Sequence, residues 1–404
     1  MFGTPARALV EGEGVYVWDA DGKRYTDFLA GIAVNALGHA HPAVVHALTE
    51  QVQTLGHISN LFTSLPQVAL AERLTQLAGA TDGACFFANS GTEANEAAFK
   101  LARRYGHSTG GKRHKIIALE NAFHGRTMGA LALTWKHQYR EPFEPLPGGV
   151  TFVPAGDFAV LNAEMDDTVA AVIIEPVQGE AGVQDFPPGY LAQVRQACDE
   201  HGALLIFDEI QSGIGRTGTW FGFQNPELTG TDQPVVPDAM TLAKGLGGGM
   251  PIGALVTFGT EVSELFTAGQ HGTTFGGNPL ATATALAVLE TIEAERVLDN
   301  VREVGSYLAE KLRALPGVKA VRAYGLWQGV ELDIEALTQQ GQNLPEAGLA
   351  PKVVSKALDY GYILNATGEL TLRLAPPLII SKEQVDPLVT DLPDILAETV
   401  AEAN

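Results

Sequence analysis

Residues 204–218 read LLIFDEIQSGIGRTG, and in this stretch a short apolar run leads directly into two adjacent acids, Asp208 and Glu209. A run that is apolar throughout is typical of a strand buried on both faces of a parallel sheet. An unpaired carboxylate is costly to remove from water, so an acid at the end of such a strand needs water or a cation beside it. Ligands of open parallel sheets bind beyond the carboxyl ends of the strands. The stretch therefore predicts an α/β sheet in which Asp208 is either solvated at a strand end or pairs with a bound cation.

Similar apolar runs alternate with helical segments on both sides of this stretch. They are ACFFA (84–88), KIIAL (115–119), AAVIIEP (170–176), ALLIFDE (203–209), AMTLA (239–243) and IGALVTF (252–258). Alternation of this kind predicts an α/β domain with a mainly parallel sheet. Glu175 follows one of the runs and is therefore a second acid expected at a strand end.

The two ends of the chain have a different pattern. Residues 15–28 alternate like strands around Asp21-Gly22, which indicates a hairpin, and residues 41–55 have helical periodicity. Residues 285–315 are helical, residues 318–332 are strand-like, and residues 381–400 form a helix that opens with a capping box from Ser381 to Gln384. We expect an N-terminal arm and small-domain segment (1–55), a large domain (56–285) and a small α+β domain (286–404).

Charge and cysteine content exclude several kinds of partner. Lys plus Arg is 26 and Asp plus Glu is 47, so the formal net charge is −21, which disfavours binding to nucleic acid or to anionic membranes. Two cysteines, Cys85 and Cys198, do not suggest a disulfide framework and fit a reducing compartment. The N-terminus lacks a long apolar stretch, and the apolar runs are too short to span a bilayer. We therefore expect a cytoplasmic protein without a secretory signal.

Lys244 follows a short apolar run and precedes a glycine-rich loop in PDAMTLAKGLGGGMPIGA (237–254). A lysine can bond an aldehyde when its amine is neutral, which requires burial or a neighbouring cation. One alternative is a surface lysine beside a flexible loop. The other is a dinucleotide-binding loop at 245–253, which the glycine spacing and the lack of a following apolar helix disfavour.

Residues 86–104 run from a strand through Ser90-Gly91-Thr92 into a helix. The free N–H groups of a helix N-terminus bind anions, and glycine permits close approach of the backbone. The alternative is an ordinary Ser/Thr helix cap. A phosphate seat, a strand-end acid and a loop lysine together predict a pocket for pyridoxal phosphate, whose ring nitrogen the acid would keep protonated. We expect no metal site.

The whole sequence resembles the class III aminotransferases, a family of fold-type I pyridoxal-phosphate enzymes, and most of all their members that act on N2-acetyl-L-ornithine. The resemblance is carried by AGIAVNALGHAHP (30–42), HISNLF (57–62), FFANSGTEANEAAFKLAR (86–103), FHGRTMGALAL (123–133), IIEPVQGEAGV (173–183), FDEIQSGIGRTG (207–218), LAKGLGGGMPIGA (242–254), HGTTFGGNP (271–279) and LRLAPPLII (372–380). It implies a large domain with a mainly parallel sheet and a smaller α+β domain built from both ends of the chain. It also implies amino transfer between N2-acetyl-L-ornithine and 2-oxoglutarate, giving N-acetyl-L-glutamate 5-semialdehyde and glutamate, in arginine biosynthesis.

The resemblance also implies a role for individual residues. Lys244 would bond the cofactor and move a proton, and Asp208 would pair with the ring nitrogen. The other implied cofactor contacts are Ser90, Gly91 and Thr92 at the phosphate, Phe123, Glu209, Ile210 and Gln211 around the ring, and Thr274 from the neighbouring subunit. The contact from Thr274 implies a homodimer with active sites at the interface.

Four further residues are implied at the substrate. Arg126 would bind the distal carboxylate and Arg373 the α-carboxylate of glutamate, because a guanidinium binds a carboxylate through two parallel hydrogen bonds. Thr273 would lie near the substrate, and Glu180 would cover Arg373 when the longer substrate binds. A surface salt bridge is the alternative for either arginine.

Rival functions remain open from the sequence. Succinylornithine, ornithine and 4-aminobutyrate aminotransferases belong to the same class, and the motifs FHGR and SNLF favour acetylornithine or succinylornithine over the other two. An NAD-dependent oxidoreductase would need a dinucleotide fingerprint on the first strand–helix turn, which the N-terminal region lacks. A catalytically silent interaction protein would not need both Lys244 and Asp208.

Overall fold

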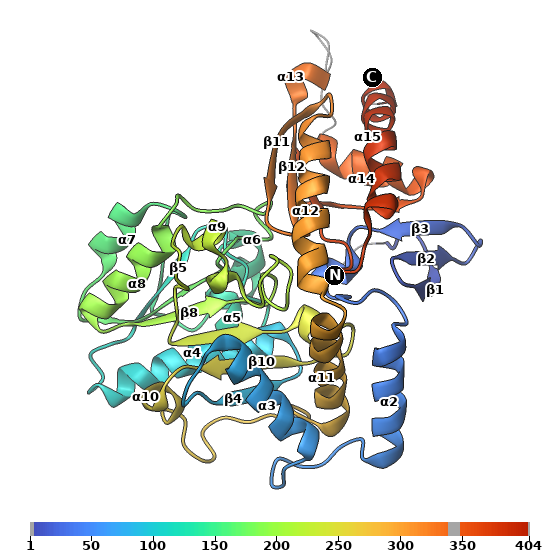
Figure 1. Cartoon of the computed structure of the whole chain (residues 1–404). Coiled ribbons are helices and arrows are strands. Elements are labelled where there is room, and N and C mark those ends of the chain that lie inside the picture. Colours follow the sequence, from blue (N-terminus) through green and yellow to red (C-terminus); the bar gives the residue numbers. More distant parts are fainter. Residues whose placement is uncertain (1–3, 338–347, 403–404) are drawn as a thin grey trace.

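A seven-stranded sheet forms the centre of the computed structural model, which describes residues 4–337 and 348–402 (Figure 1). Its strand order is β4 (Cys85–Ala88), β10 (Gly253–Thr257), β9 (Ala239–Leu242), β8 (Leu204–Asp208), β7 (Val169–Ile174), β5 (Lys115–Leu119) and β6 (Val150–Val153). Five neighbouring strands from β9 to β6 are parallel, and only β10 runs against both of its neighbours. The predicted mainly parallel sheet and the α/β fold class are confirmed.

Strand β8 shows why an apolar run without alternation was the right signal. Leu204 and Ile206 pack on one face against α4 (Gly91–Ser108), in a cluster that includes Leu101. Leu205 and Phe207 belong to the main core on the other face, where α8 (Tyr190–His201) packs on β8. Both faces are therefore covered, and Asp208 is the first residue of the run that can turn toward a ligand.

The remaining helices of this part of the chain flank the sheet or fill its loops. They are α3 (Leu65–Ala78), α5 (Met128–Ala132), α6 (His137–Arg140), α7 (Phe158–Glu164), α9 (Pro226–Thr229) and α10 (Thr260–Ser263), with short 3₁₀ turns η1 (Glu141–Phe143), η2 (Gly222–Gln224) and η3 (Lys244–Leu246). The predicted helix at 41–55 is α2 (Pro42–Thr54), which packs against α11 (Pro279–Ala294).

Both ends of the chain build two smaller sheets beside the central one (Figure 1). The first contains β1 (Leu9–Glu13), the predicted hairpin of β2 (Tyr16–Asp19) and β3 (Arg24–Asp27), and β13 (Tyr362–Ile363), which pairs in parallel with β3. The second is antiparallel, in the order β11 (Val318–Ala323), β12 (Gln328–Leu332), β15 (Thr371–Leu374) and β14 (Asn365–Ala366). The N-terminal and C-terminal segments thus share a sheet, as the resemblance implied.

The C-terminal helices are α12 (Val297–Arg313), α13 (Ile334–Leu337), α14 (Leu349–Tyr360) and α15 (Lys382–Glu402); α1 (Ala30–Ala33) lies near the N-terminus. The capping box predicted at α15 is half formed, because Gln384 accepts from the backbone N–H of Ser381 whereas the Ser381 hydroxyl bonds Glu383. The predicted domain boundary at 285/286 falls inside α11. The division into 1–55, 56–285 and 286–404 stays a prediction.

None of the helices in the described ranges is sufficiently long and apolar to cross a bilayer.

Candidate active site

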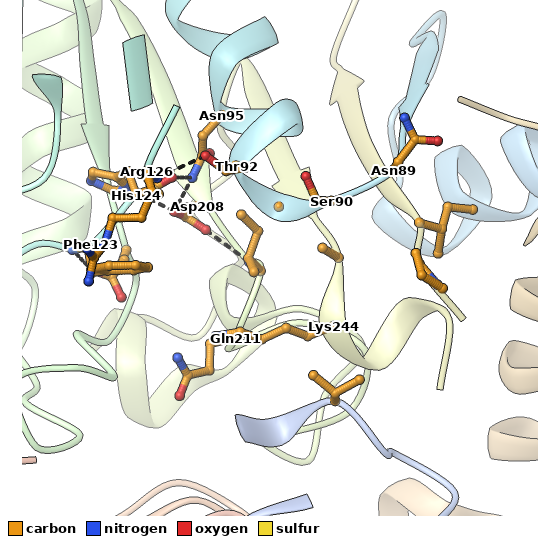
Figure 2. A pocket seen from close by; sticks show the side chains of 18 of the residues that line it. Asn89, Ser90, Thr92, Asn95, Phe123, His124, Arg126, Asp208, Gln211 and Lys244 are labelled. Carbon is orange, nitrogen blue, oxygen red and sulfur yellow. Dashed lines mark hydrogen bonds and ion pairs between the residues drawn. The ribbon is translucent and has the colours of Figure 1, made fainter. Parts of the chain in front are cut away.

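A cavity of about 420 Å³ lies at the carboxyl end of β8, where Asp208 and Lys244 both contribute to its wall (Figure 2). The predicted site residues that line it are Ser90, Gly91, Thr92, Phe123, Arg126, Asp208, Ile210, Gln211 and Lys244. They come from the start of α4, the loop before α5, the end of β8 and the turn η3. The strand-end acid and the loop lysine therefore share one pocket.

Asp208 is buried and held by three hydrogen bonds. Asn95 Nδ2 and His124 Nδ1 each lie 2.7 Å from Asp208 Oδ2, and the backbone N–H of Ile210 donates to Oδ1 at 3.1 Å. Asn95 is fixed in turn, because its second amide hydrogen bonds the His124 carbonyl and its oxygen accepts from Thr241. These three contacts fix the position of the carboxylate, and none of them comes from an arginine or a lysine.

Two more titratable groups surround this carboxylate. Burial alone would lower the pKa of His124, but the hydrogen bond and charge of Asp208, together with Glu175, raise it above its ordinary value. Burial raises the pKa of Glu175 to about 7, although backbone N–H groups of Phe123 and Gly179 bond its oxygens. The buried side of the pocket therefore brings two carboxyl groups and an imidazole together, and the Asp208 carboxylate is the acceptor available to a cationic ring atom of a ligand.

Lys244 begins the turn η3 and has a backbone φ of +44°. A left-handed conformation costs a residue with a Cβ about 1–2 kcal/mol, and such strain is concentrated at functional sites. Burial lowers the pKa of the Lys244 amine to about 8, with Arg373 acting in the same direction and Glu180 and Asp208 opposing it. A larger share of this amine is therefore neutral near physiological pH than for an exposed lysine.

The start of α4 presents backbone donors to the cavity. Ser90 is the N-cap residue and accepts from the N–H of Glu93, whereas no acceptor is recorded within the described residues for the N–H groups of Gly91 and Thr92. A Cβ at Gly91 would lie 2.8 Å from Ile210 Cδ1, closer than such atoms approach. Thr92 Oγ1 accepts from the N–H groups of Arg126 and Thr127, which ties the next loop to the helix.

Arg126 lies at the mouth of the cavity between two aromatic rings. Its guanidinium carbon is 3.6 Å from the ring centre of Tyr139 and 5.6 Å from that of Phe123. No carboxylate pairs with it within the described ranges of the chain. An oriented, unpaired guanidinium beside a pocket is suited to an anionic substrate group.

Arg373 is buried on β15, behind Gln211. Its Nη1 contacts Glu180 Oε1 at 2.5 Å and donates to Gln211 Oε1 at 3.0 Å. Burial would raise the pKa of Glu180, but the charges of Arg373 and Lys244 bring it below its ordinary value. The predicted pair of Glu180 and Arg373 is therefore in contact, and Gln211 connects it to the cavity.

The structure does not bring every predicted residue to the cavity. The Glu209 carboxylate accepts instead from the N–H groups of Gly222 and Phe223 and bonds Ser212, so it stabilises the turn η2. Thr273 bonds Asn89, which lines the cavity, but Thr273 itself does not line it. Thr274 is exposed and also lies outside the lining.

Four polar residues of the site were not among the predicted ones, and one of them is Asn89, which lines the cavity and bonds Thr273. Asn95 and His124 hold Asp208, and Asn365 bonds Arg373. The only sequence signal was position: Asn95 lies one helical turn after Gly91, and His124 lies between Phe123 and Gly125 in a quoted motif.

The donor set fits pyridoxal phosphate. The N–H groups at the start of α4, which have no acceptor among the residues that the structure describes, suit its phosphate. The ring of Phe123 offers an aromatic face, and Asp208 is an acceptor for a protonated ring nitrogen. Lys244 supplies an amine for its aldehyde. Among the described residues there is no group of three or more His, Cys, Asp or Glu that could hold a metal.

Comparisons with known proteins agree with this geometry. The family model "Aminotransferase class-III" matches residues 3–396. The chain is 48% identical over 403 residues to the acetylornithine aminotransferase of Mycolicibacterium smegmatis, covering 99% of this chain and 96% of that protein. It is 49% identical to the acetylornithine aminotransferase of Streptomyces coelicolor, covering 100% and 94%.

Two solved structures show the same fold. The ornithine aminotransferase of Toxoplasma gondii has a TM-score of 0.89 at 30% identity, covering 100% of this chain and 93% of that one. The acetylornithine aminotransferase of Elizabethkingia anophelis has a TM-score of 0.80 at 31% identity, covering 99% and 95%. With a strand-end carboxylate and a loop lysine on one cavity, the chain belongs to the class III aminotransferases, which are pyridoxal-phosphate-dependent enzymes of fold type I.

Proposed function

We propose that this enzyme transfers the terminal amino group of N2-acetyl-L-ornithine to 2-oxoglutarate, giving N-acetyl-L-glutamate 5-semialdehyde and L-glutamate, as a step of arginine biosynthesis. The observation that carries the proposal is the pair of arginines around the cavity of Lys244. Arg126 lies at its mouth without a carboxylate partner in the described part of the chain, and Arg373 is paired with Glu180 behind Gln211. Relatives at 48–49% identity bear the name acetylornithine aminotransferase, which supports this substrate.

When bound, pyridoxal phosphate supplies an electron sink that stabilises negative charge on the carbon from which a proton is removed. We assign Gly91 and Thr92 N–H to its phosphate, Phe123 to the face of its ring, Asp208 to its ring nitrogen and Lys244 to its aldehyde. Ser90, Ile210 and Gln211 complete the wall around it. Thr274 would reach the phosphate of the partner subunit's site, because it is exposed here and outside the cavity of its own chain.

Lys244 would act as the base and acid of the reaction. Its Nζ is neutral above a pKa of about 8 and, once released from the aldehyde, would take a proton from the substrate carbon that bears the amine. The same Nζ would then give this proton to the cofactor side of the reacting pair, so that the lysine is neutral again for the second substrate. Asp208, held by Asn95 and His124, would keep a positive charge on the facing ring atom throughout.

The two arginines explain how one pocket would accept two different substrates. Arg126 would bind the carboxylate that lies far from the reacting amine. With glutamate, the α-carboxylate would replace Glu180 on Arg373; with acetylornithine, whose reacting carbon has no carboxylate, Glu180 would stay paired. Thr273, held by Asn89 at the edge of the cavity, is the proposed further substrate contact.

We also propose a homodimer in the cytoplasm. Leu61, Phe62 and Leu65 are 86%, 72% and 87% exposed, and Phe275 is 60% exposed. The two segments adjoin each other, because Asn60 bonds the carbonyls of Thr273 and Gly276. An apolar patch of this kind beside Thr274 supports an interface that joins two active sites, and sedimentation of the holoenzyme measures it. Two free cysteines fit a reducing compartment.

A panel of single half-reactions tests the substrate. The cofactor-loaded enzyme is mixed separately with N2-acetylornithine, N2-succinylornithine, ornithine and 4-aminobutyrate, and loss of the bound-cofactor absorbance is followed by stopped flow. We expect the highest kcat/KM with N2-acetylornithine, by about tenfold or more over ornithine and 4-aminobutyrate. A higher value with succinylornithine, ornithine or 4-aminobutyrate would overturn the assignment of substrate and leave the class unchanged.

A further inference from the structure

Asn365 lies directly opposite Arg373 in the antiparallel pair of β14 and β15. Its single side-chain oxygen, Oδ1, accepts from Arg373 Nε at 3.1 Å and from Nη2 at 2.8 Å. These two donors form the side edge of the guanidinium plane, so one neutral oxygen occupies that edge. The contact is set by strand pairing, because the two residues face each other in register.

The end of the same guanidinium is held by groups of a different kind. Nη1 contacts Glu180 Oε1, Gln211 Oε1 and, at 3.4 Å, the carbonyl of Gly179. Glu180 is the only one of these groups in the described chain that carries a charge, and its side chain is 37% exposed. Asn365 instead lies within a strand at a half-buried position. The edge formed by Nε and Nη2 is therefore held by a residue of a strand, whereas the charged partner of Nη1 is an exposed carboxylate of a loop.

We infer that Asn365 is a positioning residue for carboxylate recognition: it fixes the side edge of Arg373 with an uncharged acceptor and leaves the Nη1–Nη2 edge as the only place where a substrate carboxylate can bind. The inference rests on the proposed role of Arg373. A carboxylate at position 365 would fill the same space but would neutralise the guanidinium permanently. The amide holds the geometry and preserves the charge for an anion that exchanges with Glu180.

Isosteric replacement of the Asn365 amide separates its effect on the geometry of Arg373 from its effect on the charge beside Arg373. In the holoenzyme, Asn365→Asp keeps the acceptor and adds a fixed charge next to the binding edge. We titrate wild type and variant with glutarate, which has both carboxylates of glutamate but no reactive group, and measure the dissociation constant by calorimetry. We expect glutarate to bind about tenfold or more weakly to the variant, because it would then share the Arg373 guanidinium with a fixed carboxylate at position 365.

Asn162→Asp is the matched control, since Asn162 is an exposed residue of α7 and the change adds the same charge. It should leave glutarate affinity within about twofold of wild type, as a distant surface charge is largely screened. Asn365→Ala, which removes the acceptor without adding charge, should also weaken glutarate binding. It keeps the inference testable if the aspartate variant does not fold.

The kinetic readout is a ratio between two substrates on one protein. Asn365→Asp should raise KM for glutamate about tenfold while changing KM for N2-acetylornithine by less than about threefold, because only glutamate needs Arg373 uncovered. Equal losses with both substrates, or unchanged glutarate affinity, would overturn the role of Asn365. If wild type failed to use N2-acetylornithine but bound glutarate, the proposed substrate would fall and the glutarate comparison would still decide the inference.

Discussion

His124 Nδ1 and Asp208 Oδ2 lie 2.7 Å apart, and the His124 side chain has no exposed surface. The imidazole holds one oxygen of the Asp208 carboxylate from the protein side. The carboxylate can therefore face a cationic group in the cavity. Since Asp208 raises the pKa of His124, the positive form of the histidine is favoured next to the negative form of the acid. The positive form of His124 thus compensates the Asp208 carboxylate inside the protein, where an unpaired buried carboxylate would be costly.

Removing that charge should abolish most of the activity. Asp208→Asn keeps the shape of the side chain but no longer stabilises a protonated ring nitrogen, so we expect the single-turnover rate of proton removal to fall by about 10²-fold or more. Stopped-flow absorbance with N2-acetylornithine measures this rate. Asp167→Asn, at an exposed position without a recorded partner among the described residues, is the charge-matched control and should behave as wild type. A normal rate in Asp208→Asn would refute the assigned role of this acid.

The close contact of Gly91 with Ile210 makes a steric prediction. A Cβ at position 91 would lie 2.8 Å from Ile210 Cδ1, so Gly91→Ala should displace the start of α4 and weaken cofactor binding by about tenfold. Equilibrium titration of the apoenzyme with pyridoxal phosphate measures the effect. Adding Ile210→Val removes Cδ1 and should restore part of the affinity. Gly148→Ala, where a Cβ meets nothing within 4 Å, serves as control, and equal losses in both alanine variants would contradict the mechanism.

The lowered pKa of Lys244 predicts a pH dependence with a definite sign. The amine is protonated and unreactive below about pH 8 and neutral above it, so the rate of cofactor capture by the apoenzyme should rise through pH 8 and then level off. Absorbance of the bound cofactor follows this rate. N-acetyl-lysine methylamide, whose amine has an ordinary pKa of about 10.4, should show its inflection more than two pH units higher. An inflection of the protein rate near that of the free amine would mean that burial does not activate Lys244.

The parts of the site that sequence alone predicted are those fixed by local structure. Asp208 ends an apolar run, Lys244 follows another, and Gly91 opens a helix, so each position follows from a strand end or a helix start. Strand β6 was not predicted, because its residues are mostly half-buried at the edge of the sheet and lack the continuous burial of β7 or β8. An edge strand carries a weaker pattern than a central one.

Contacts that depend on packing between distant segments were not predictable in the same way. Asn95 reaches Asp208 across 113 residues of sequence, and Glu180 reaches Arg373 across 193. The resemblance supplied the second pair, whereas nothing local marks Asn95 as different from a solvated helix residue. The stretch predicted to be helical over 285–315 forms parts of two helices, α11 and α12, and Arg296 adopts a φ of +53° between them. The apolar spacing also slips here, because Ile292 and Val297 are buried five residues apart and the charged Glu295 and Arg296 stand where a continuous helix would carry its next apolar residue.

Glu180→Gln tests whether the carboxylate on Arg373 is exchangeable. The glutamine keeps an oxygen near Nη1 but removes the charge that competes with the α-carboxylate of glutamate, so KM for glutamate should fall or stay constant. N2-Acetylornithine should be used about tenfold less efficiently, because its reacting end would then face an uncompensated buried guanidinium. Half-reaction kinetics with each substrate give the ratio of the two kcat/KM values. The control is Asp185→Asn. Asp185 accepts a hydrogen bond from Tyr324, away from Arg373, so this change removes the same charge and should leave the ratio unchanged. A ratio in Glu180→Gln equal to that of wild type would mean that Glu180 contributes to folding of the loop and not to the choice between substrates.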